Sequence, residues 1–254
     1  MILVIDTGNT HTVIGCVNDQ DEVLQRLRIP TDTTETECGY AAKMNEIFRI
    51  FKIDTNQIEA AVISSVVPPV TTALKKAVKI LTGLDALVLG EGIKTGLEIK
   101  LEGGIAPDLE ATAVAVKDDF ALPCVIVDMG TATTVTVVDE TGAYIGGCIL
   151  PGVGTSLNAL VEKTSLLPGI SIEPPTRAIA VDTVDAMKSG VVYGAAGSID
   201  GIIDHFAKEL GREPASIVTT GGIGHLIAPV CRHDIIVDDD LLLKGLIKIY
   251  KMNK

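Results

Sequence analysis

The sequence predicts an α/β protein built from two similar halves, and three observations lead to this fold class. An apolar run that ends in Asp-x-Gly and is followed by hydroxyl side chains occurs twice. The two aspartates, Asp6 and Asp128, lie 122 positions apart (128 − 6), close to half of the 254 residues. Each copy opens three expected strands, and the chain is 47% hydrophobic but only 3% aromatic, so the core is aliphatic, as in α/β proteins. A duplicated domain explains these features together.

The repeated motif is Asp-x-Gly-x-x-x-Thr-Val. Its members are Asp6, Gly8, Thr12 and Val13 in the first copy and Asp128, Gly130, Thr134 and Val135 in the second. A carboxylate at a strand end can hold a hydrated divalent cation, and a glycine lets the backbone approach a phosphate. Hydroxyl and backbone N–H groups then bond the phosphate oxygens. A single triplet of this kind is usually a plain hairpin turn, but its recurrence at half-chain spacing favours a pair of phosphate turns.

The first half begins with three expected strands, at 2–5, 11–17 and 23–29. Apolar residues at helical spacing over 40–51 predict a helix whose buried face includes Phe51, and a strand is expected at 60–63. After a break at Pro68-Pro69, Thr71 is the expected cap of a second helix that Gly83 ends. A short strand at 86–89 and a helix over 108–116 complete this half, which we place at 1–117.

The second half, 118–254, repeats the opening order, with strands at 124–128, 133–138 and 144–149. Ser156 is the expected cap of a helix to 164, and Asp182 or Thr183 caps a long helix that Gly211 ends. Four glycines in that long helix predict close packing, either against a second subunit or against a strand. A strand at 217–219 leads to Gly221-Gly222, and a helix over 239–252 ends the chain with its lysines at the end that the helix dipole favours.

Composition excludes several kinds of partner. The net charge is −12 without a basic patch, which argues against nucleic acid or an anionic membrane surface. The pattern predicts neither a membrane span nor a signal peptide, and five cysteines without a C-x-x-C pair are expected to be reduced thiols of a cytoplasmic protein. His205, His225 and His233 lack metal-site spacing. The acids at 238–240 are expected to be a solvated helix start.

Two α/β halves, each opening on a three-strand meander that carries a phosphate turn, are the actin-like (ribonuclease H-like) architecture of acetate and sugar kinases. This fold predicts ATP in a cleft between 1–117 and 118–254.

The chain also resembles one family, the type III pantothenate kinases. The matching segments are Asp6-Thr7-Gly8-Asn9-Thr10, Ile63-Ser64-Ser65-Val66-Val67-Pro68, Asp128-Met129-Gly130-Thr131-Ala132-Thr133-Thr134, Gly146-Gly147 with Ile149, Pro151-Gly152, Leu167-Pro168, Thr183, Met187 with Ser189-Gly190, Tyr193-Gly194 and Thr220-Gly221-Gly222. They follow the family's order and spacing over nearly the whole chain. The resemblance implies a homodimer that uses ATP to phosphorylate pantothenate to 4'-phosphopantothenate, the first step of coenzyme A biosynthesis. The implied cofactors are magnesium and a monovalent cation, potassium or ammonium.

Site residues follow from the same resemblance. The implied ATP contacts are Asp6, Thr7, Gly8, Asn9, Thr10, His11, Thr12, Val13, Thr131, Gly221 and Gly222. Asp6 would hold magnesium through water, and Asp128 would hold the monovalent cation. His11 is equally compatible with an ordinary position in a surface turn.

The acceptor side matches the family less well. Ala106-Pro107-Asp108-Leu109 stands where the family has Gly-Ala-Asp-Arg, so these residues and Thr183 are the implied substrate contacts, with Asp108 as the catalytic base. Leu109 replaces the arginine, and Leu101-Glu102-Gly103-Gly104 replaces Tyr-Asp-Asn-Pro in a loop about two residues shorter. The segment 31–36 also lacks an expected arginine. Asp108 has a second interpretation as a helix N-cap.

Three functions therefore compete. The first is a pantothenate kinase whose acceptor use is altered. The second is a kinase for a different small hydroxylated acceptor. The third is a non-catalytic, nucleotide-binding regulatory homologue, for which binding of magnesium-ATP without phosphorylation of an acceptor would be the sign.

Overall fold

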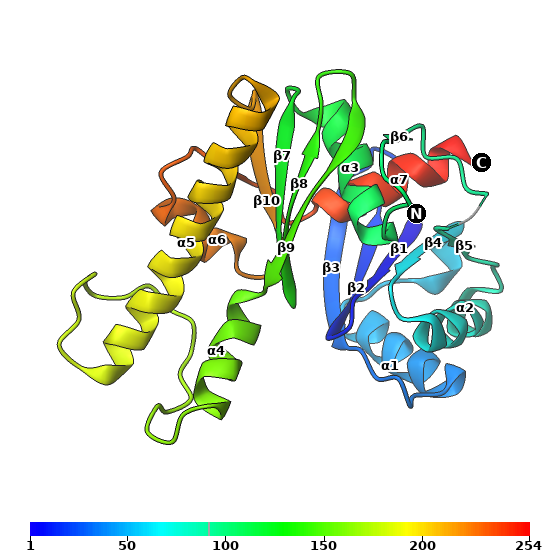
Figure 1. Cartoon of the computed structure of the whole chain (residues 1–254). Coiled ribbons are helices and arrows are strands. Elements are labelled where there is room, and N and C mark those ends of the chain that lie inside the picture. The colour runs from blue at the N-terminus through cyan, green and yellow to red at the C-terminus, as the bar shows by residue number, and fades with distance from the viewer. Residues whose placement is uncertain (91) are drawn as a thin grey trace. The chain divides into compact units, whose positions relative to one another are not determined.

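The computed structural model describes residues 1–90 and 92–254 (Figure 1). Contacts divide the chain into two compact units, the first made of Met1–Leu97, Gly103–Ala115 and Asp240–Lys254, and the second of Glu98–Glu102 and Val116–Asp239. The expected halves, 1–117 and 118–254, differ from these units chiefly in the last helix, which is part of the first unit. No helix in the described part of the chain is long and apolar enough to cross a membrane.

The first unit contains a five-stranded sheet. Its strands are β1 (Ile2–Thr7), β2 (His11–Val17), β3 (Val23–Pro30), β4 (Ala60–Ser65) and β5 (Leu87–Val88), in the order β3-β2-β1-β4-β5. The first three strands form an antiparallel meander, whereas β4 and β5 run parallel to β1. The central strands β1 and β4 are almost entirely buried, as expected for strands with both faces covered.

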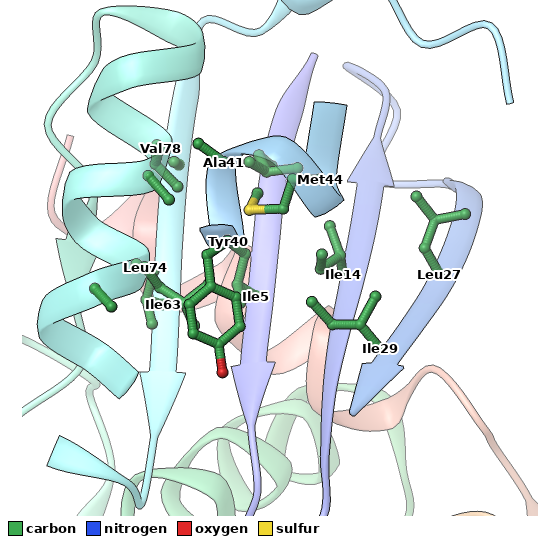
Figure 2. Packing of buried hydrophobic residues seen from close by; sticks show 14 of the residues in the cluster. Ile5, Ile14, Leu27, Ile29, Tyr40, Ala41, Met44, Ile63, Leu74 and Val78 are labelled. Atoms are coloured by element: carbon green, nitrogen blue, oxygen red, sulfur yellow. The ribbon is translucent and has the colours of Figure 1, made fainter. Parts of the chain in front are cut away.

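Helices cover both faces of this first sheet. On one face, α1 (Glu37–Ile50) and α2 (Pro68–Thr82), with the 3₁₀ turn η1 (Thr55–Gln57) between them, pack Tyr40, Met44 and Leu74 against Ile5 and Ile63 (Figure 2). On the other face, α3 (Pro107–Asp119) and α7 (Leu241–Met252) pack against β1, β2 and β4. The apolar face of α7 therefore completes the core of the first unit.

Of three expectations about these helices, two are corrected and one is confirmed. Helix α2 begins at Pro68, with Val67 at the N-cap, and not at Thr71, because proline fits the first helical turn, where its missing N–H is not needed. Phe51 is 49% exposed because α1 ends before it and the residue lies at the C-cap. Gly83 ends α2 in the left-handed conformation, as predicted.

The second unit contains a six-stranded sheet. Its strands are β6 (Glu98–Ile99), β7 (Cys124–Met129), β8 (Ala132–Val138), β9 (Ala143–Pro151), β10 (Ser216–Thr220) and β11 (Ile236–Val237), in the order β11-β10-β7-β8-β9-β6. The helices are α4 (Val153–Glu162), α5 (Thr183–Leu210) and α6 (Gly224–Ile227), followed by the 3₁₀ turn η2 (Ala228–Val230). Helix α5 buries Val192, Ile199 and Ile203 against β7 and β8.

Helix boundaries in this unit follow the predictions at α5 but not at α4. Asp182 caps α5 by accepting a hydrogen bond from the backbone N–H of Asp185, and Gly211 ends the helix in the left-handed conformation. Helix α4 begins at Val153, three residues before the expected cap at Ser156, with Gly152 at the N-cap. Gly152 is held there by a contact with the preceding turn and not by a side-chain cap.

The two sheets confirm the predicted duplication. Without the edge strand β6, the order of the second sheet is β9-β8-β7-β10-β11, which repeats β3-β2-β1-β4-β5 with the same strand directions. A register irregularity between Cys16 and Val17 has its counterpart between Val137 and Val138, 121 positions later (137 − 16). Equivalent residues are 122 positions apart before the two turns, at Asp6 and Asp128, and 121 positions apart after them, because the first turn is one residue longer than the second.

That difference corrects the overlay of the two motifs. Thr7 pairs with Thr12 across the first turn, and Met129 pairs with Thr133 across the second, so Thr12 is equivalent to Thr133 and not to Thr134. The Thr-Val pairs that match in sequence, Thr12-Val13 and Thr134-Val135, are therefore one residue out of register in the structure. The aspartates and glycines themselves are equivalent, as predicted.

Candidate functional site

The first turn is closed by short contacts around Asp6 and Gly8. The N–H of Gly8 donates to the carbonyl of His11 at 3.0 Å, which closes the hairpin. Ser64 Oγ donates to Asp6 Oδ1 at 2.9 Å, and Ser64 is fully buried on the parallel neighbour strand. The Asp6 carboxylate is thus oriented at the end of β1 by a hydroxyl that the strand register places beside it.

His11 and Arg28 form a pair next to this turn. Arg28 Nη2 lies 2.7 Å from His11 Nδ1, and because arginine can only donate, Nδ1 is the acceptor and the imidazole proton is on Nε2. Burial lowers the pKa of His11, and the Arg28 guanidinium lowers it further, so the imidazole is neutral at neutral pH. The guanidinium brings a permanent positive charge to the edge of the turn. Sequence reasoning missed Arg28, whose only signal is its place near the end of a strand paired with β2.

The second turn is held by the start of α4. The N–H of Gly130 donates to Ala132 O at 3.0 Å, and Thr131 O accepts from Gly152 N–H at 3.1 Å and from Thr155 Oγ1 at 2.7 Å. A β-carbon on Gly152 would lie 2.3 Å from Gly130 O and 2.4 Å from Thr131 O, so only glycine fits.

The segment with Gly221 packs against the same turn. Gly221 follows β10 with φ of 92°, and a β-carbon there would lie 2.7 Å from the backbone of Met129, the residue before Gly130. The structure therefore brings the segment that begins at Gly221, one of the implied ATP contacts, against the second turn. On β10, Thr220 pairs with Asp128 just as Ser64 pairs with Asp6 on β4.

Thr134 is the neighbour of Asp128 on the adjacent strand. The two residues are directly opposite each other in the β7–β8 register, so their side chains share a face. Within residues 1–90 and 92–254, Thr134 Oγ1 is buried without a hydrogen-bond partner. An oxygen of this kind beside a carboxylate is a suitable ligand for a hard cation. The described residues contain no cluster of three or more His, Cys, Asp or Glu that could hold a metal ion.

Asp108 lies in the first turn of α3, in the same unit as Asp6. The helix begins at Pro107, so the N-cap interpretation of Asp108 is wrong, although its Oδ1 accepts from the N–H of Leu109 at 2.9 Å. Burial raises the pKa of Asp108 above its ordinary value, and the backbone hydrogen bonds only partly oppose this effect. Ala106 and Leu109 are half-buried beside it.

The divergent loop before α3 is fixed at the residue that precedes it, Lys100. Lys100 Nζ donates to Asp139 Oδ2 at 2.8 Å, and Asp139 also accepts from Thr141 and from the N–H of Ala143. Burial alone would raise the pKa of Asp139, but these bonds outweigh it and hold the pKa well below its ordinary value. Gly103 and Gly104 follow with φ of 88° and 84°, which only glycine adopts readily.

Thr183 opens α5 at the rim of an apolar cavity. The cavity has a volume of about 770 Å³ and lies between α4, α5 and β9, with Leu157, Leu160 and Met187 among its lining residues. Apolar side chains are exposed in the same unit. Among them are Ile149, Leu160, Leu166, Ile179, Val181, Val184 and Tyr193, from 40% to 91% exposed.

Comparison with known proteins gives a consistent result. The family model described as type III pantothenate kinase matches residues 2–205. A type III pantothenate kinase of Syntrophus aciditrophicus is 38% identical over 255 residues, and one of Exiguobacterium sibiricum is 40% identical over 256 residues, with both chains covered completely in each case. Among solved structures, a ROK family glucokinase of Streptomyces griseus is similar with a TM-score of 0.56 at 13% identity, covering 98% of each chain. This likeness confirms the predicted sugar-kinase type of fold.

Proposed function

The chain belongs to the type III pantothenate kinase family, and from that premise we propose how its own residues divide the work of the reaction. It is an ATP-dependent kinase that phosphorylates pantothenate in coenzyme A biosynthesis. The observation that carries this function is the similarity to curated kinases over the entire chain. The two equivalent closed turns supply the physical basis for binding a polyphosphate.

The turns are the proposed phosphate contacts. In the first turn the proposed contacts are Asp6 to Val13. In the second turn the proposed contact is Thr131, and the segment Gly221-Gly222 packs against this turn. Phosphoryl transfer needs little covalent chemistry from the protein, because positioning and charge neutralisation lower most of the barrier. Fixed backbone N–H groups and the nearby Arg28 guanidinium meet both needs.

The residues also fit the two implied cations. Asp6, which Ser64 orients through a hydrogen bond to Oδ1, offers a carboxylate to the water shell of magnesium. Asp128 and the buried Thr134 hydroxyl offer hard oxygen ligands to potassium or ammonium. When bound, such cations neutralise the charge that develops on the transferred phosphoryl group.

Asp108 is the proposed general base. The primary hydroxyl of pantothenate would give its proton to the Asp108 carboxylate as its oxygen bonds to the γ-phosphorus, while the bond from that phosphorus to the bridging oxygen breaks and releases ADP. A carboxylate whose pKa is raised by burial is a better proton acceptor than an exposed one, which suits this role.

Leu109 bears on acceptor affinity. Where the family resemblance leads us to expect an arginine, this chain offers an apolar side chain to a substrate that is an anion. We therefore propose that the first turn of α3 binds pantothenate more weakly than it would with an arginine at position 109. Thr183 is a further proposed contact of the substrate.

The quaternary state in this proposal is a homodimer. The apolar cavity and the exposed side chains of the second unit support it, because burying them removes apolar surface from water. Light scattering should give about twice 26.6 kDa. Leu160→Lys should shift the protein toward the monomer, whereas Ile80→Lys, at a 57% exposed position on α2, should not. A wild-type monomer at micromolar concentration would contradict this part. Cytoplasmic residence also belongs to the proposal, in keeping with five unpaired cysteines.

Calorimetry of magnesium-ATP binding tests the phosphate assignment. Asp6→Asn should weaken binding about tenfold or more, because it removes the charge proposed to face the hydrated cation. Asp19→Asn is the matched control, since Asp19 is an exposed acid in the turn between β2 and β3 of the same unit. Equal affinities of the two variants would remove Asp6 from the phosphate site.

A further inference from the structure

Thr31, the residue after β3, is bonded to the first turn at three points. Its N–H donates to Thr10 O at 3.0 Å, and its Oγ1 donates to Gly8 O at 2.8 Å. The third contact joins Thr31 Oγ1 and Thr12 Oγ1 at 3.0 Å. The hydroxyl of Thr12 also donates to Thr7 Oγ1 at 3.4 Å, so Thr12 Oγ1 lies between Thr7 and Thr31. Thr31 thus connects the beginning, the tip and the end of the turn.

The segment that carries Thr31 is itself fixed to the core. The hydroxyl of Tyr40 donates to Asp32 O and accepts from Asp32 N–H, both at 2.9 Å. Tyr40 is fully buried among Ile5, Met44 and Leu74 in the core between α1, α2 and the sheet (Figure 2). The Tyr40 side chain therefore holds both the N–H and the carbonyl of Asp32, the residue next to Thr31.

The second turn gives an internal comparison. Pro30 and Pro151 end equivalent strands, so Thr31 is equivalent to Gly152, whose N–H also donates to its turn. Gly152 has no side chain, and Thr133, the equivalent of Thr12, has a buried hydroxyl that lacks a partner among the described residues. The hydroxyl bonds of Thr31 are therefore an addition specific to the first turn.

We propose that Thr31, anchored through Asp32 to the hydroxyl of Tyr40, is a positioning residue that fixes the first turn for binding of the ATP phosphates. This inference rests on the proposed function, which places those phosphates at the turn. Thr31 acts through Gly8 and Thr12. Without its hydroxyl, the carbonyl of Gly8 loses its side-chain donor and the buried hydroxyl of Thr12 loses the nearer of its two partners among the described residues, keeping Thr7 at 3.4 Å. The backbone of the first turn, from Gly8 to Thr12, would then no longer be held in one geometry for the phosphates.

Steady-state kinetics of four variants test this role. Thr31→Val keeps the shape and removes the hydroxyl, so the KM for magnesium-ATP should rise about tenfold while the KM for pantothenate changes less than about twofold. Thr31→Ser should restore the wild-type KM. Tyr40→Phe should raise the same KM by a smaller factor, because the core packing remains. Thr33→Val, an exposed threonine of the same loop, is the matched control and should match wild type.

Thermal melting separates positioning from a general structural role. Thr31→Val and Thr31→Ser are compared at saturating and limiting ATP. If Thr31→Val lowers the melting temperature but leaves both KM values unchanged, or if Thr31→Ser fails to restore the KM, the inference is overturned. If Thr31→Val binds ATP normally while Asp6→Asn does not, the inference fails and the proposed function stands. If neither variant affects ATP binding, the assignment of the phosphates to this turn is wrong, and the inference about Thr31 is wrong with it.

Discussion

Gly152→Ala offers a direct test of the second turn, because the structure fixes the size of the disturbance. The β-carbon would lie 2.3 Å from Gly130 O and 2.4 Å from Thr131 O, whereas real β-carbons essentially never approach closer than 3.0 Å. Gly152 has φ of −61° and ψ of 156°, which alanine adopts without strain. Any effect of the substitution therefore comes from the collision with the turn and not from backbone conformation.

The collision requires the turn and the start of α4 to separate by at least 0.7 Å, from 2.3 to 3.0 Å. The hydrogen bond from Gly152 N–H to Thr131 O, now 3.1 Å, would lengthen beyond useful range. Displacement of a positioning element by about 1 Å can reduce a rate by about a hundredfold. We expect kcat/KM for magnesium-ATP to fall about 30- to 100-fold, and overpacking to cost about 1–3 kcal/mol of stability.

Gly154→Ala is the matched control two residues further along. Its β-carbon would meet only Ile172 Cδ1, at 4.0 Å, and alanine inside a helix is more stable than glycine by about 0.5–1 kcal/mol. This variant should keep full activity and melt at the same or a higher temperature. If Gly152→Ala is less stable but has normal kcat/KM, the position of the second turn does not matter for catalysis, and its assignment to phosphate binding is wrong.

Three further predictions concern charged or substituted residues. Asp108→Asn should abolish turnover, whereas calorimetry should show near-normal ATP affinity. Because burial raises the pKa of Asp108, the ionised carboxylate destabilises the folded protein above that pKa. The variant should therefore melt at a higher temperature than wild type at neutral pH, and this difference should disappear as the pH falls through the pKa. Leu109→Arg should lower the KM for pantothenate, by a factor smaller than the about 2–5 kcal/mol of a buried charge pair would give, whereas Leu109→Met should leave this KM unchanged. Unchanged pantothenate kinetics in the arginine variant would remove Leu109 from the acceptor site. Asp139→Asn should lose about 2 kcal/mol, measured by denaturant unfolding at neutral pH. Because the folded-state pKa of Asp139 is depressed, the difference from wild type should shrink as the pH falls below about 4, and a constant difference would exclude the Lys100 pair as its cause.

Sequence patterns predicted the sheets better than they predicted helix starts or the association of elements. The strand at 11–17 was predicted to the residue, since alternation and a polar turn define it locally. The caps predicted at Thr71 and Ser156 were wrong because the cap rule looks for a side-chain oxygen, whereas a proline and a turn contact set these starts. The sequence pattern predicted a helix over 239–252 but not which sheet it covers, and Val4, Val17 and Val62 of the first sheet provide that surface.

The candidate site shows the same limit. Asp6, Gly8, Asp128 and Gly130 stand out because a carboxylate and a glycine after an apolar run form a local pattern. Ser64, Thr31 and Thr155 act through partners 58, 23 and 24 positions away, and a single sequence does not reveal such pairs without the strand register. Their functional roles remain predictions, as does that of Asp108.

The displaced Thr-Val match shows why a repeat in sequence and a repeat in structure need not agree. Identity favours aligning Thr12 with Thr134, but the strand pairs and the shared register irregularity align it with Thr133. The extra residue lengthens the first turn, and Thr31 supplies hydrogen bonds that hold this longer loop. The shorter second turn leaves no room for a side chain at Gly152, so α4 begins directly against it and Thr155 holds Thr131 O instead. The two halves therefore keep one backbone arrangement and support it with different residues.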